Sequence, residues 1–338
     1  MVPVLIAGLL GMVSAVVIGP KFIERLRARD LGQQIREEGP ATHRVKQGTP
    51  TMGGVLIVGA SVVPFLLLSQ RTIEGFTVLF ITLGCAAIGF GDDYLKVRRR
   101  HSLGLPGRWK MALLALITVG AALLLRESAG FDTSLYLPVV GWNLELGVFY
   151  YPFLFVVIAG TVNGANLTDG IDGLLAGVAT IALLTFLAIV GISWLRSGDP
   201  GARSDDFLDL ATLAAALIGG TIGFLWYNAF PAEVIMGDTG SFALGGAIAG
   251  FAIVTDTEIL LLLIGGIFVI EVLSLIIQVV SFKRTGKRVF LMAPIHHHFE
   301  MKAWSETKVM VRFWIVAAIL CASGFALFYR DFLQFVGS

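Results

Sequence analysis

VPVLIAGLLGMVSAVVIG, residues 2–19, contains no charged side chain. A helix of about this length spans the hydrocarbon core of a bilayer, which is roughly 30 Å thick. No basic residue precedes the run, no small-residue cleavage site follows it, and further apolar runs come soon after it. The stretch therefore predicts a first membrane-spanning helix rather than a secretory signal peptide.

The composition of the whole chain agrees with this prediction. Of its 338 residues, 56% are hydrophobic and only 14% are charged, whereas a soluble domain carries roughly 25% charged residues. This composition excludes a soluble globule. The net charge of +1 conceals a strong segregation of charge along the chain and gives no indication of nucleic-acid binding. Cys85 and Cys321 lie within apolar runs, without His or Cys neighbours at metal-ligand spacing, so we expect both to be buried.

Apolar runs close to the length of a membrane span recur along the chain. No repeat of fixed period and no linker divides them, so they predict a single all-α integral membrane domain over residues 1–338. An even number of spans places both termini on the same side. The ten predicted transmembrane helices lie near residues 2–19, 52–69, 76–91, 111–125, 148–164, 173–195, 210–228, 241–255, 259–282 and 309–329.

Lys and Arg side chains indicate which side of the membrane is cytoplasmic. Loops 21–51, 92–110 and 283–308 together contain nineteen of them, and the loops of the opposite side contain five. Because cytoplasmic loops carry the excess of basic residues, the first side is predicted to be cytoplasmic and both termini periplasmic.

Two of the connecting segments show a pattern of their own. Residues 131–147, on the periplasmic side, alternate apolar and polar side chains and predict either a small hairpin or an irregular loop. Basic residues at helical spacing between positions 283 and 288 fit a cytoplasmic interfacial helix held against anionic headgroups, or a topology signal alone.

Five polar clusters interrupt the apolar pattern, and the ten-span topology places all of them on the cytoplasmic side. A miscount of one span would scatter them over both sides, so their convergence also supports the topology. The clusters are TPTMGG (49–54), DDY (92–94), NGANLTDGIDG (163–173), residues 228–241, and PIHHHFE (294–300).

Aspartates within these clusters point to a metal ion. Carboxylates at the ends of membrane helices are costly unless they are paired, hydrated or bound to a cation. Mg²⁺ prefers one or two carboxylates together with phosphate oxygens and water, so acids beside basic loops suit a metal bound with a polyphosphate. Any single acid could instead cap a helix or face solvent, but five on one side favour the metal site. They are Asp92, Asp93, Asp169, Asp172 and Asp238.

Spacing suggests how some of these acids are presented. Asp169 and Asp172 are three residues apart and share one face if the segment is helical, which suits a metal ion or a sugar hydroxyl. Asp92 and Asp93 are adjacent, so their side chains diverge by about 100° on a helix and only one is expected to face a reacting phosphate. Residues 236–241 begin an apolar run, and their amides are predicted to form a helix N-terminus suited to an anion, or an ordinary capped helix start.

Three consecutive histidines, residues 296–298, form the remaining cluster. Their side chains cannot readily converge on one ion, and no Cys or spaced His pair completes a zinc site, so zinc is disfavoured. Contacts with a phosphate or a sugar, or proton transfer, are the expected roles.

Seven motifs, spread over essentially the whole chain, resemble those of the phospho-N-acetylmuramoyl-pentapeptide transferases, which belong to the polyprenyl-phosphate N-acetylhexosamine-1-phosphate transferase superfamily. Short aspartate motifs recur throughout the superfamily, but TPTMGG together with PIHHHFE is specific to this branch. The motifs are KQGTPTMGG (46–54), DDYLK (92–96), GRWK (107–110), NLTDGIDGL (166–174), WYNAFPA (226–232), MGDTGS (236–241) and PIHHHFE (294–300).

The resemblance implies an activity in peptidoglycan synthesis. The enzyme would transfer phospho-MurNAc-pentapeptide from UDP-MurNAc-pentapeptide to undecaprenyl phosphate at the cytoplasmic face of the bacterial inner membrane. The products would be lipid I and UMP, and Mg²⁺ would be required. The resemblance also implies that a homodimer can form and that no nucleic acid takes part.

Individual site residues follow from the same resemblance. The metal ligand would be Asp238, the other catalytic acids Asp92 and Asp93, and the functional histidines His297 and His298. The implied nucleoside site comprises Lys46, Asp169, Gly170, Asp172 and Asn228, the phosphate-binding residues are Lys96 and Arg108, and the other expected substrate contacts are Thr51, Asn166, Ser241, Gln278 and His296.

Two mechanisms remain open for such a transfer. An Asp could act as a nucleophile and form a covalent intermediate, or the lipid phosphate could attack directly with an Asp as base. Direct attack is favoured, because a phosphate monoester with a second pKa near 6 is already mostly dianionic at pH 7. The Gly265–Gly266 pair weakens the ninth span, so we expect a bend that opens a lateral groove for the lipid tail.

Two other functions compete with this interpretation. The nearest is a sister transferase that moves GlcNAc-1-phosphate to the same lipid. The second is a secondary transporter, which would use an acid near mid-membrane, and Glu271 in the ninth span is the candidate. The alternative for Glu271 is a bundle-facing residue with a polar neighbour such as Gln278.

Overall fold

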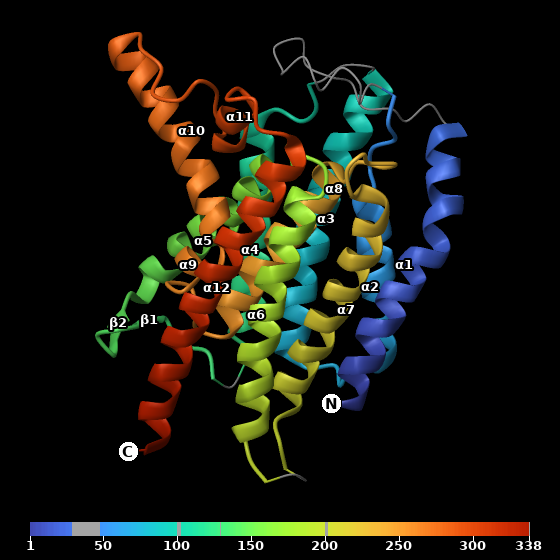
Figure 1. Ribbon diagram of the computed structural model, residues 1–338. Helices are drawn as coiled ribbons and strands as arrows, with labels where there is room; N and C mark the ends of the chain where they lie inside the picture. Colours follow the sequence, from blue (N-terminus) through green and yellow to red (C-terminus); the bar gives the residue numbers. More distant parts are fainter. Residues whose placement is uncertain (29–47, 100–102, 129, 200–201, 338) are drawn as a thin grey trace.

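The computed structural model describes residues 1–28, 48–99, 103–128, 130–199 and 202–337, which form a bundle of helices packed side by side (Figure 1). The helices are α1 (Val2–Ala28), α2 (Gly54–Leu68), α3 (Ile73–Arg99), α4 (Gly107–Leu125), α5 (Tyr150–Thr168), α6 (Leu174–Arg196), α7 (Asp205–Asn228), α8 (Gly237–Val254), α9 (Leu261–Ile264), α10 (Gly266–Thr285), α11 (Ile295–Glu300) and α12 (Glu306–Gly337).

Within the described residues, nine helices are long and apolar enough to cross a membrane. All ten predicted runs are helical, and the nine long helices confirm an all-α, multi-pass membrane protein. The remaining run is α2, which has 15 residues and is therefore ~22 Å long at 1.5 Å per residue. Ten complete crossings stay a prediction. Cys85 and Cys321 are buried and unpaired, as expected.

Helix α8 lies at the centre of the bundle, and every residue from Asp238 to Ile253 is buried. Its glycines let neighbouring backbones approach closely. Membrane helices associate through such close packing, because the hydrophobic effect between helices is weak within a bilayer. A Cβ on Gly246 would lie 2.8 Å from the Cys85 Sγ of α3, and one on Gly245 would lie 2.8 Å from the Val162 Cα of α5. Helices α3 and α5 therefore bring their ends to the start of α8.

A buried acid on α7 fixes the turn between α2 and α3. Asp209 accepts hydrogen bonds from the Gln70 N–H at 2.7 Å, the Thr72 N–H at 3.1 Å and the Ser69 hydroxyl at 2.9 Å. The first N–H groups of a helix have no intrahelical acceptor, and the Thr72 hydroxyl accepts the Gly75 N–H of α3 at 3.2 Å. Asp209 of α7 therefore holds the residue that caps α3.

The segment between α4 and α5 forms the predicted hairpin. Strand β1 (Ser134–Leu137) pairs in antiparallel register with β2 (Trp142–Glu145). The Tyr136 hydroxyl of β1 donates to the Asp331 carboxylate at 3.1 Å, so the hairpin is tied to the last part of α12.

The ninth predicted span is interrupted, which confirms the expected bend. Helix α9 ends at Ile264, Gly265 has φ −91° and ψ 20°, and α10 begins at Gly266. In Figure 1 the far end of α10 stands away from the rest of the bundle. A groove for a lipid tail beside it remains a prediction.

The predicted interfacial helix at residues 283–288 is wrong. Helix α10 ends at Thr285, and Gly286 follows with φ 68°, a left-handed conformation that ends helices and favours glycine. Lys283 and Arg284 therefore belong to the last turn of α10, where cations complement the helix dipole. Figure 1 shows both termini at its lower end and α11 at the opposite end.

Candidate active site

Three buried aspartates meet where α3 ends and α8 begins. Asp92 and Asp93 lie in the last third of α3, and Asp238 lies in the first turn of α8. One carboxylate oxygen from each lies within 4.8 Å of the others. The close packing of α3 on α8 explains the approach, because a Cβ on Gly89 would lie only 2.1 Å from the Asp238 carbonyl oxygen.

Two lysine ammonium groups lie among these carboxylates. The Lys96 Nζ is 2.6 Å from Asp92 Oδ2 and 3.1 Å from Asp238 Oδ1. The Lys110 Nζ, from the first turn of α4, is 3.1 Å from Asp92 Oδ1 and 2.8 Å from Asp238 Oδ2. With all five groups ionised, the cluster keeps one negative charge in excess. The arrangement attracts cations and still leaves charged donors for an anionic substrate.

The carboxylate of Asp93 is engaged differently from that of Asp92. Its oxygens accept hydrogen bonds from the Asp238 N–H at 3.0 Å, the Thr239 N–H at 2.9 Å and the Thr239 hydroxyl at 2.7 Å. Asp93 therefore caps α8. Asp92 accepts one backbone bond, from the Leu105 N–H at 2.6 Å, and otherwise faces the two lysines, in agreement with the expected divergence of the two side chains.

The first amides of α8 already donate hydrogen bonds to side chains of the protein. The predicted anion site at this helix N-terminus is therefore wrong for the amides of Gly237, Asp238 and Thr239. The Gly237 N–H donates to the Asp169 carboxylate, and the next two amides donate to Asp93. The helix N-terminus binds anions as its dipole requires, but they are the protein's own carboxylates.

Asp238 itself is oriented by side chains on α5 and α8. The Asn166 amide donates to Asp238 Oδ1 at 2.9 Å and to the Ser241 hydroxyl at 3.0 Å. The Ser241 hydroxyl lies 3.4 Å from the carbonyl oxygen of Asp238. Both residues were expected to contact substrate, and the structure places both directly at the acid cluster.

The TPTMGG segment builds one wall of the site. The Gly53 and Gly54 N–H groups donate to the carbonyls of Ile235 and Met236, each at 2.9 Å, and a Cβ on Gly54 would lie 2.0 Å from the Gly240 nitrogen. Thr51 is buried, with its hydroxyl 3.0 Å from the position of a Cβ on Gly237. The preceding Lys46 lies outside the described residues.

Residues 169–173 form a turn between α5 and α6, so Asp169 and Asp172 do not meet the condition of a helical segment on which a shared face was expected. Asp169 points to α8, and Asp172 accepts the Ala232 N–H at 3.0 Å. Burial, followed by the charges of Asp238, Asp93 and Asp172, raises the pKa of Asp169 well above its usual range. A turn forms because Gly173 adopts φ 74°, which costs glycine little.

Asn228, expected in the nucleoside site, is buried with its amide already engaged. Its Oδ1 accepts the Gly173 N–H at 3.0 Å, and its Nδ2 donates to the Val234 carbonyl at 2.9 Å. It therefore holds the 169–173 turn against the segment that precedes α8.

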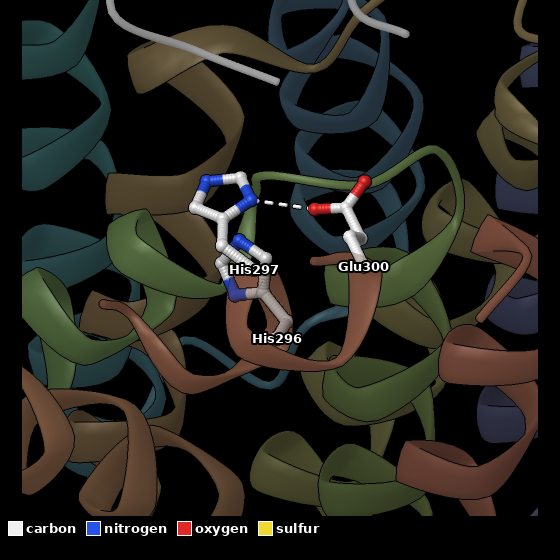
Figure 2. A group of neighbouring side chains, drawn as sticks. All are labelled: His296, His297 and Glu300. Carbon is white, nitrogen blue, oxygen red and sulfur yellow. Dashed lines mark hydrogen bonds and ion pairs between the residues drawn. The ribbon is translucent and has the colours of Figure 1, made fainter. Parts of the chain in front are cut away.

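The histidines lie on the short helix α11, and two of them adjoin an acid (Figure 2). His297 Nδ1 is 2.5 Å from Glu300 Oε2, and the rings of His296 and His297 are 4.1 Å apart. Contrary to expectation, these two rings do meet, and with Glu300 they offer ligand atoms within 4.8 Å of one another. His298 turns away from this group, because its Nδ1 accepts the Leu291 N–H at 3.1 Å, and burial lowers its pKa, with Lys302 adding to the effect.

Two residues predicted to bind substrate lie elsewhere or have other partners. Arg108 is exposed in the first turn of α4. Gln278 uses both ends of its amide on the loop after α10: Oε1 accepts the N–H groups of Val289 and Phe290 at 3.1 and 2.9 Å, and Nε2 donates to the Phe290 carbonyl at 3.2 Å.

The sequence reasoning missed two side chains that the structure brings into the site. Lys110 belongs to the GRWK motif, but only Arg108 of that motif was expected to bind phosphate. Side chains two positions apart on a helix point in nearly opposite directions, and Lys110 is the one that faces the acids. Glu271 is bonded to His296, with Oε1 3.0 Å from Nδ1, and not to Gln278. The sequence signal for Lys110 was a second basic residue in the GRWK motif, whereas Glu271 was considered only as a transporter acid or as a neighbour of Gln278.

The sequence is similar to known protein families and to individual proteins. The model of glycosyl transferase family 4 matches residues 76–256, and signature 1 of phospho-N-acetylmuramoyl-pentapeptide-transferase matches residues 46–58. Proteins with that name are similar to this chain over almost its whole length. The one from Rubrobacter xylanophilus is 47% identical and covers 93% of each chain, the one from Frankia alni is 46% identical and covers 98% of each, and the one from Desulfitobacterium hafniense is 44% identical and covers 94% of this chain and 95% of its own. The chain therefore belongs to the phospho-N-acetylmuramoyl-pentapeptide-transferase family, within glycosyl transferase family 4.

Proposed function

We propose that this protein transfers phospho-MurNAc-pentapeptide from UDP-MurNAc-pentapeptide to undecaprenyl phosphate, forming lipid I and UMP in peptidoglycan synthesis. One observation carries the proposal. In a chain 44–47% identical to transferases of that name, three buried aspartates and two lysines converge at the junction of α3, α4 and α8. Phosphoryl transfer depends mainly on positioning and charge neutralisation, which such a cluster can supply.

The acid cluster fits a Mg²⁺ ion. Its donors are carboxylate oxygens, the ligands that this hard cation prefers, and the ammonium groups of Lys96 and Lys110 mark the space between Asp92 and Asp238 as favourable for positive charge. Asp238 would hold the ion, with Asp92 beside it. When bound, Mg²⁺ neutralises the diphosphate and stabilises the leaving UMP.

The protein's own residues have distinct tasks in this proposal. Lys96 and Lys110 bind phosphate oxygens of the two substrates and hold them together despite their charge. Asp93, fixed on the α8 amides, positions Asp238. The lipid phosphate dianion attacks the sugar-linked phosphorus, the new P–O bond forms, and the bond to UMP breaks. Asp92, which faces the lysines, is the acid available to take a proton from a lipid phosphate that arrives as a monoanion.

The proposed location is the cytoplasmic face of the bacterial inner membrane, with ten crossings and both termini periplasmic. The basic residues of the loops support it, nineteen against five, and so does the position of both termini at the end of the bundle opposite to α11. The nucleotide donor is made in the cytoplasm while the acceptor lies in the membrane, so the reaction requires a site at that boundary.

Purified protein in detergent tests the proposal by UMP release. We expect release with UDP-MurNAc-pentapeptide, undecaprenyl phosphate and Mg²⁺, and none when UDP-GlcNAc replaces the donor. Efficient UMP release with UDP-GlcNAc as the donor, and none with UDP-MurNAc-pentapeptide, would assign the protein to the sister transferases. The variant Asp238→Asn, which keeps the size of the side chain, is the control for contaminating hydrolases.

A further inference from the structure

Glu271 is a fully buried carboxylate inside a candidate membrane span. An acid in this position is costly unless its charge is paired and its oxygens are hydrogen-bonded. Both oxygens are in fact used. Oε2 accepts the Ile295 N–H at 3.0 Å, and Oε1 lies 3.0 Å from His296 Nδ1.

The first of these bonds completes helix α11. Ile295 is its first residue, and the preceding Pro294 supplies neither an N–H nor a side-chain cap. Glu271 provides the missing acceptor from another helix, 24 residues earlier in the chain. A six-residue helix has little stability of its own, so this carboxylate fixes where α11 begins.

The second bond fixes the ring of His296. With the carboxylate as acceptor, Nδ1 carries the proton, and this selects the orientation of the imidazole. Among the described residues Nε2 has no hydrogen-bond partner, although it is buried. It lies against Gly170, where a Cβ would be only 2.2 Å away, so the ring is pressed on the turn that carries Asp169.

These contacts form a continuous chain from α10 to the acid cluster. Glu271 holds His296, His296 packs on Gly170, and the adjacent Asp169 accepts the Gly237 N–H at the start of α8. Helix α10 follows the break at Gly265, and most of its residues are not buried. Gln278 and His298 hold the loop between the two helices, whereas Glu271 bonds α10 directly to the start of α11.

We propose that Glu271 is a positioning residue of the active site, which acts through His296 to hold α11 and its histidines against the 169–173 turn. The inference rests on the proposed function, because its main measurement is UMP release. It replaces the transport role considered for Glu271 with a place in the transferase site.

The decisive experiment is a double-mutant cycle with Glu271→Gln, His296→Phe and the double variant. Gln keeps one carbonyl acceptor for the Ile295 N–H but turns an NH₂ group toward Nδ1, so the ring must change tautomer or move. Because misplacement of about 1 Å at an active site can cost 10²-fold, we expect kcat/KM to fall at least tenfold in each single variant. The double variant should be no worse than the poorer single variant, since residues that act through one another are not additive.

A spectroscopic measurement separates positioning from general damage. In protein labelled with ¹⁵N-histidine, the His296 resonances, assigned by their loss in His296→Phe, should report an Nδ1–H tautomer in the wild type and a different state in Glu271→Gln. The matched control is Glu258→Gln, the same substitution at another buried acid, which accepts the Tyr150 hydroxyl at 2.6 Å. It should leave kcat/KM unchanged.

The outcomes are distinct. Additive losses in the cycle, an unchanged His296 tautomer, or an equal loss in Glu258→Gln would each overturn the positioning role of Glu271. Absence of UMP release from the wild type would instead overturn the proposed function, and the tautomer measurement would still decide whether Glu271 sets the state of His296. If Glu271→Gln does not accumulate, Glu271→Asp takes its place, since it keeps the charge but shortens the reach by one methylene.

Discussion

The ammonium of Lys110 lies 2.8 Å from the carboxylate of Asp238. Lys110 also reaches Asp92 at 3.1 Å, whereas Arg108, two residues earlier, is exposed. We expect Lys110→Met to lower kcat/KM about 10²-fold, the scale of losing one preorganised donor to developing charge. The matched variant Arg108→Met should lose less than about tenfold. A larger loss in Arg108→Met would return the phosphate-binding role to the residue that the sequence suggested.

Removal of the metal tests the acid cluster directly. We expect EDTA to reduce UMP release to background and added Mg²⁺ to restore it. Added Mg²⁺ should not restore UMP release to Asp238→Asn, because the carboxylate that would hold the ion has lost its charge. Full activity in EDTA would contradict a Mg²⁺-dependent reaction.

The dependence of UMP release on the lipid distinguishes direct attack from a covalent intermediate. Asp93 is fixed by three hydrogen bonds at the start of α8 and Asp92 faces two lysines, and neither arrangement frees a carboxylate as a nucleophile. We expect no UMP from the donor in a rapid-quench experiment without polyprenyl phosphate. A burst of UMP equal to the enzyme concentration would show that an acid of the protein attacks first.

Contact between α2 and α8 can be tested with two glycines of the same helix. A Cβ on Gly54 would lie 2.0 Å from the Gly240 nitrogen, whereas nothing lies within 4 Å of one on Gly59. Gly54→Ala must push α2 away from α8, and overpacking of this kind costs about 1–3 kcal/mol. We expect a lower melting temperature and a lower kcat for Gly54→Ala, and wild-type values for Gly59→Ala. Equal behaviour of the two variants would contradict a tight contact here.

Glu258 predicts a pH dependence of stability. Burial raises its pKa to about 7, although the Tyr150 hydroxyl donates to it. Between its ordinary pKa and 7 the folded protein keeps a proton that the unfolded chain releases, so stability falls as pH rises through this window. The penalty is complete above pH 7 and amounts to a few kcal/mol. Melting temperatures at pH 5 and pH 8 should differ more for the wild type than for Glu258→Gln. An identical difference would show that Glu258 does not titrate in this range.

The order of the helices could be predicted from the sequence because each apolar run has its own length and its own flanking charges. The bend at Gly265 and the hairpin at residues 134–145 could also be predicted, because glycine pairs and alternating side chains determine the backbone within a few residues. The gathering of Asp92, Asp93 and Asp238 was also predictable, because topology alone brings those loops to one side.

The side-chain partners were not predictable, since they depend on how one helix is rotated against another. Lys110 rather than Arg108 faces the acids because α4 packs on α3 and α5 with that face turned inward. The Lys110 ammonium reaches α8, where it lies 5.2 Å from the Phe242 ring centre. Glu271 and His296 are 25 residues apart and meet only because the chain folds back after α10. The amides of Gly237, Asp238 and Thr239 could not be assigned to Asp169 and Asp93 without knowing which helices are neighbours.

Among the described residues, two helix starts receive an acceptor from a different helix: Asp93 serves α8 and Glu271 serves α11. Asp209 of α7 likewise holds the turn before α3. Such bonds connect helices in a lipid environment, where apolar contact contributes little to helix association because lipid tails are equally apolar. Inactivation on replacing Asp93 is thus no proof that its carboxylate takes part in the reaction. Loss of the bond between two transmembrane segments would stop turnover as completely as loss of a reacting group.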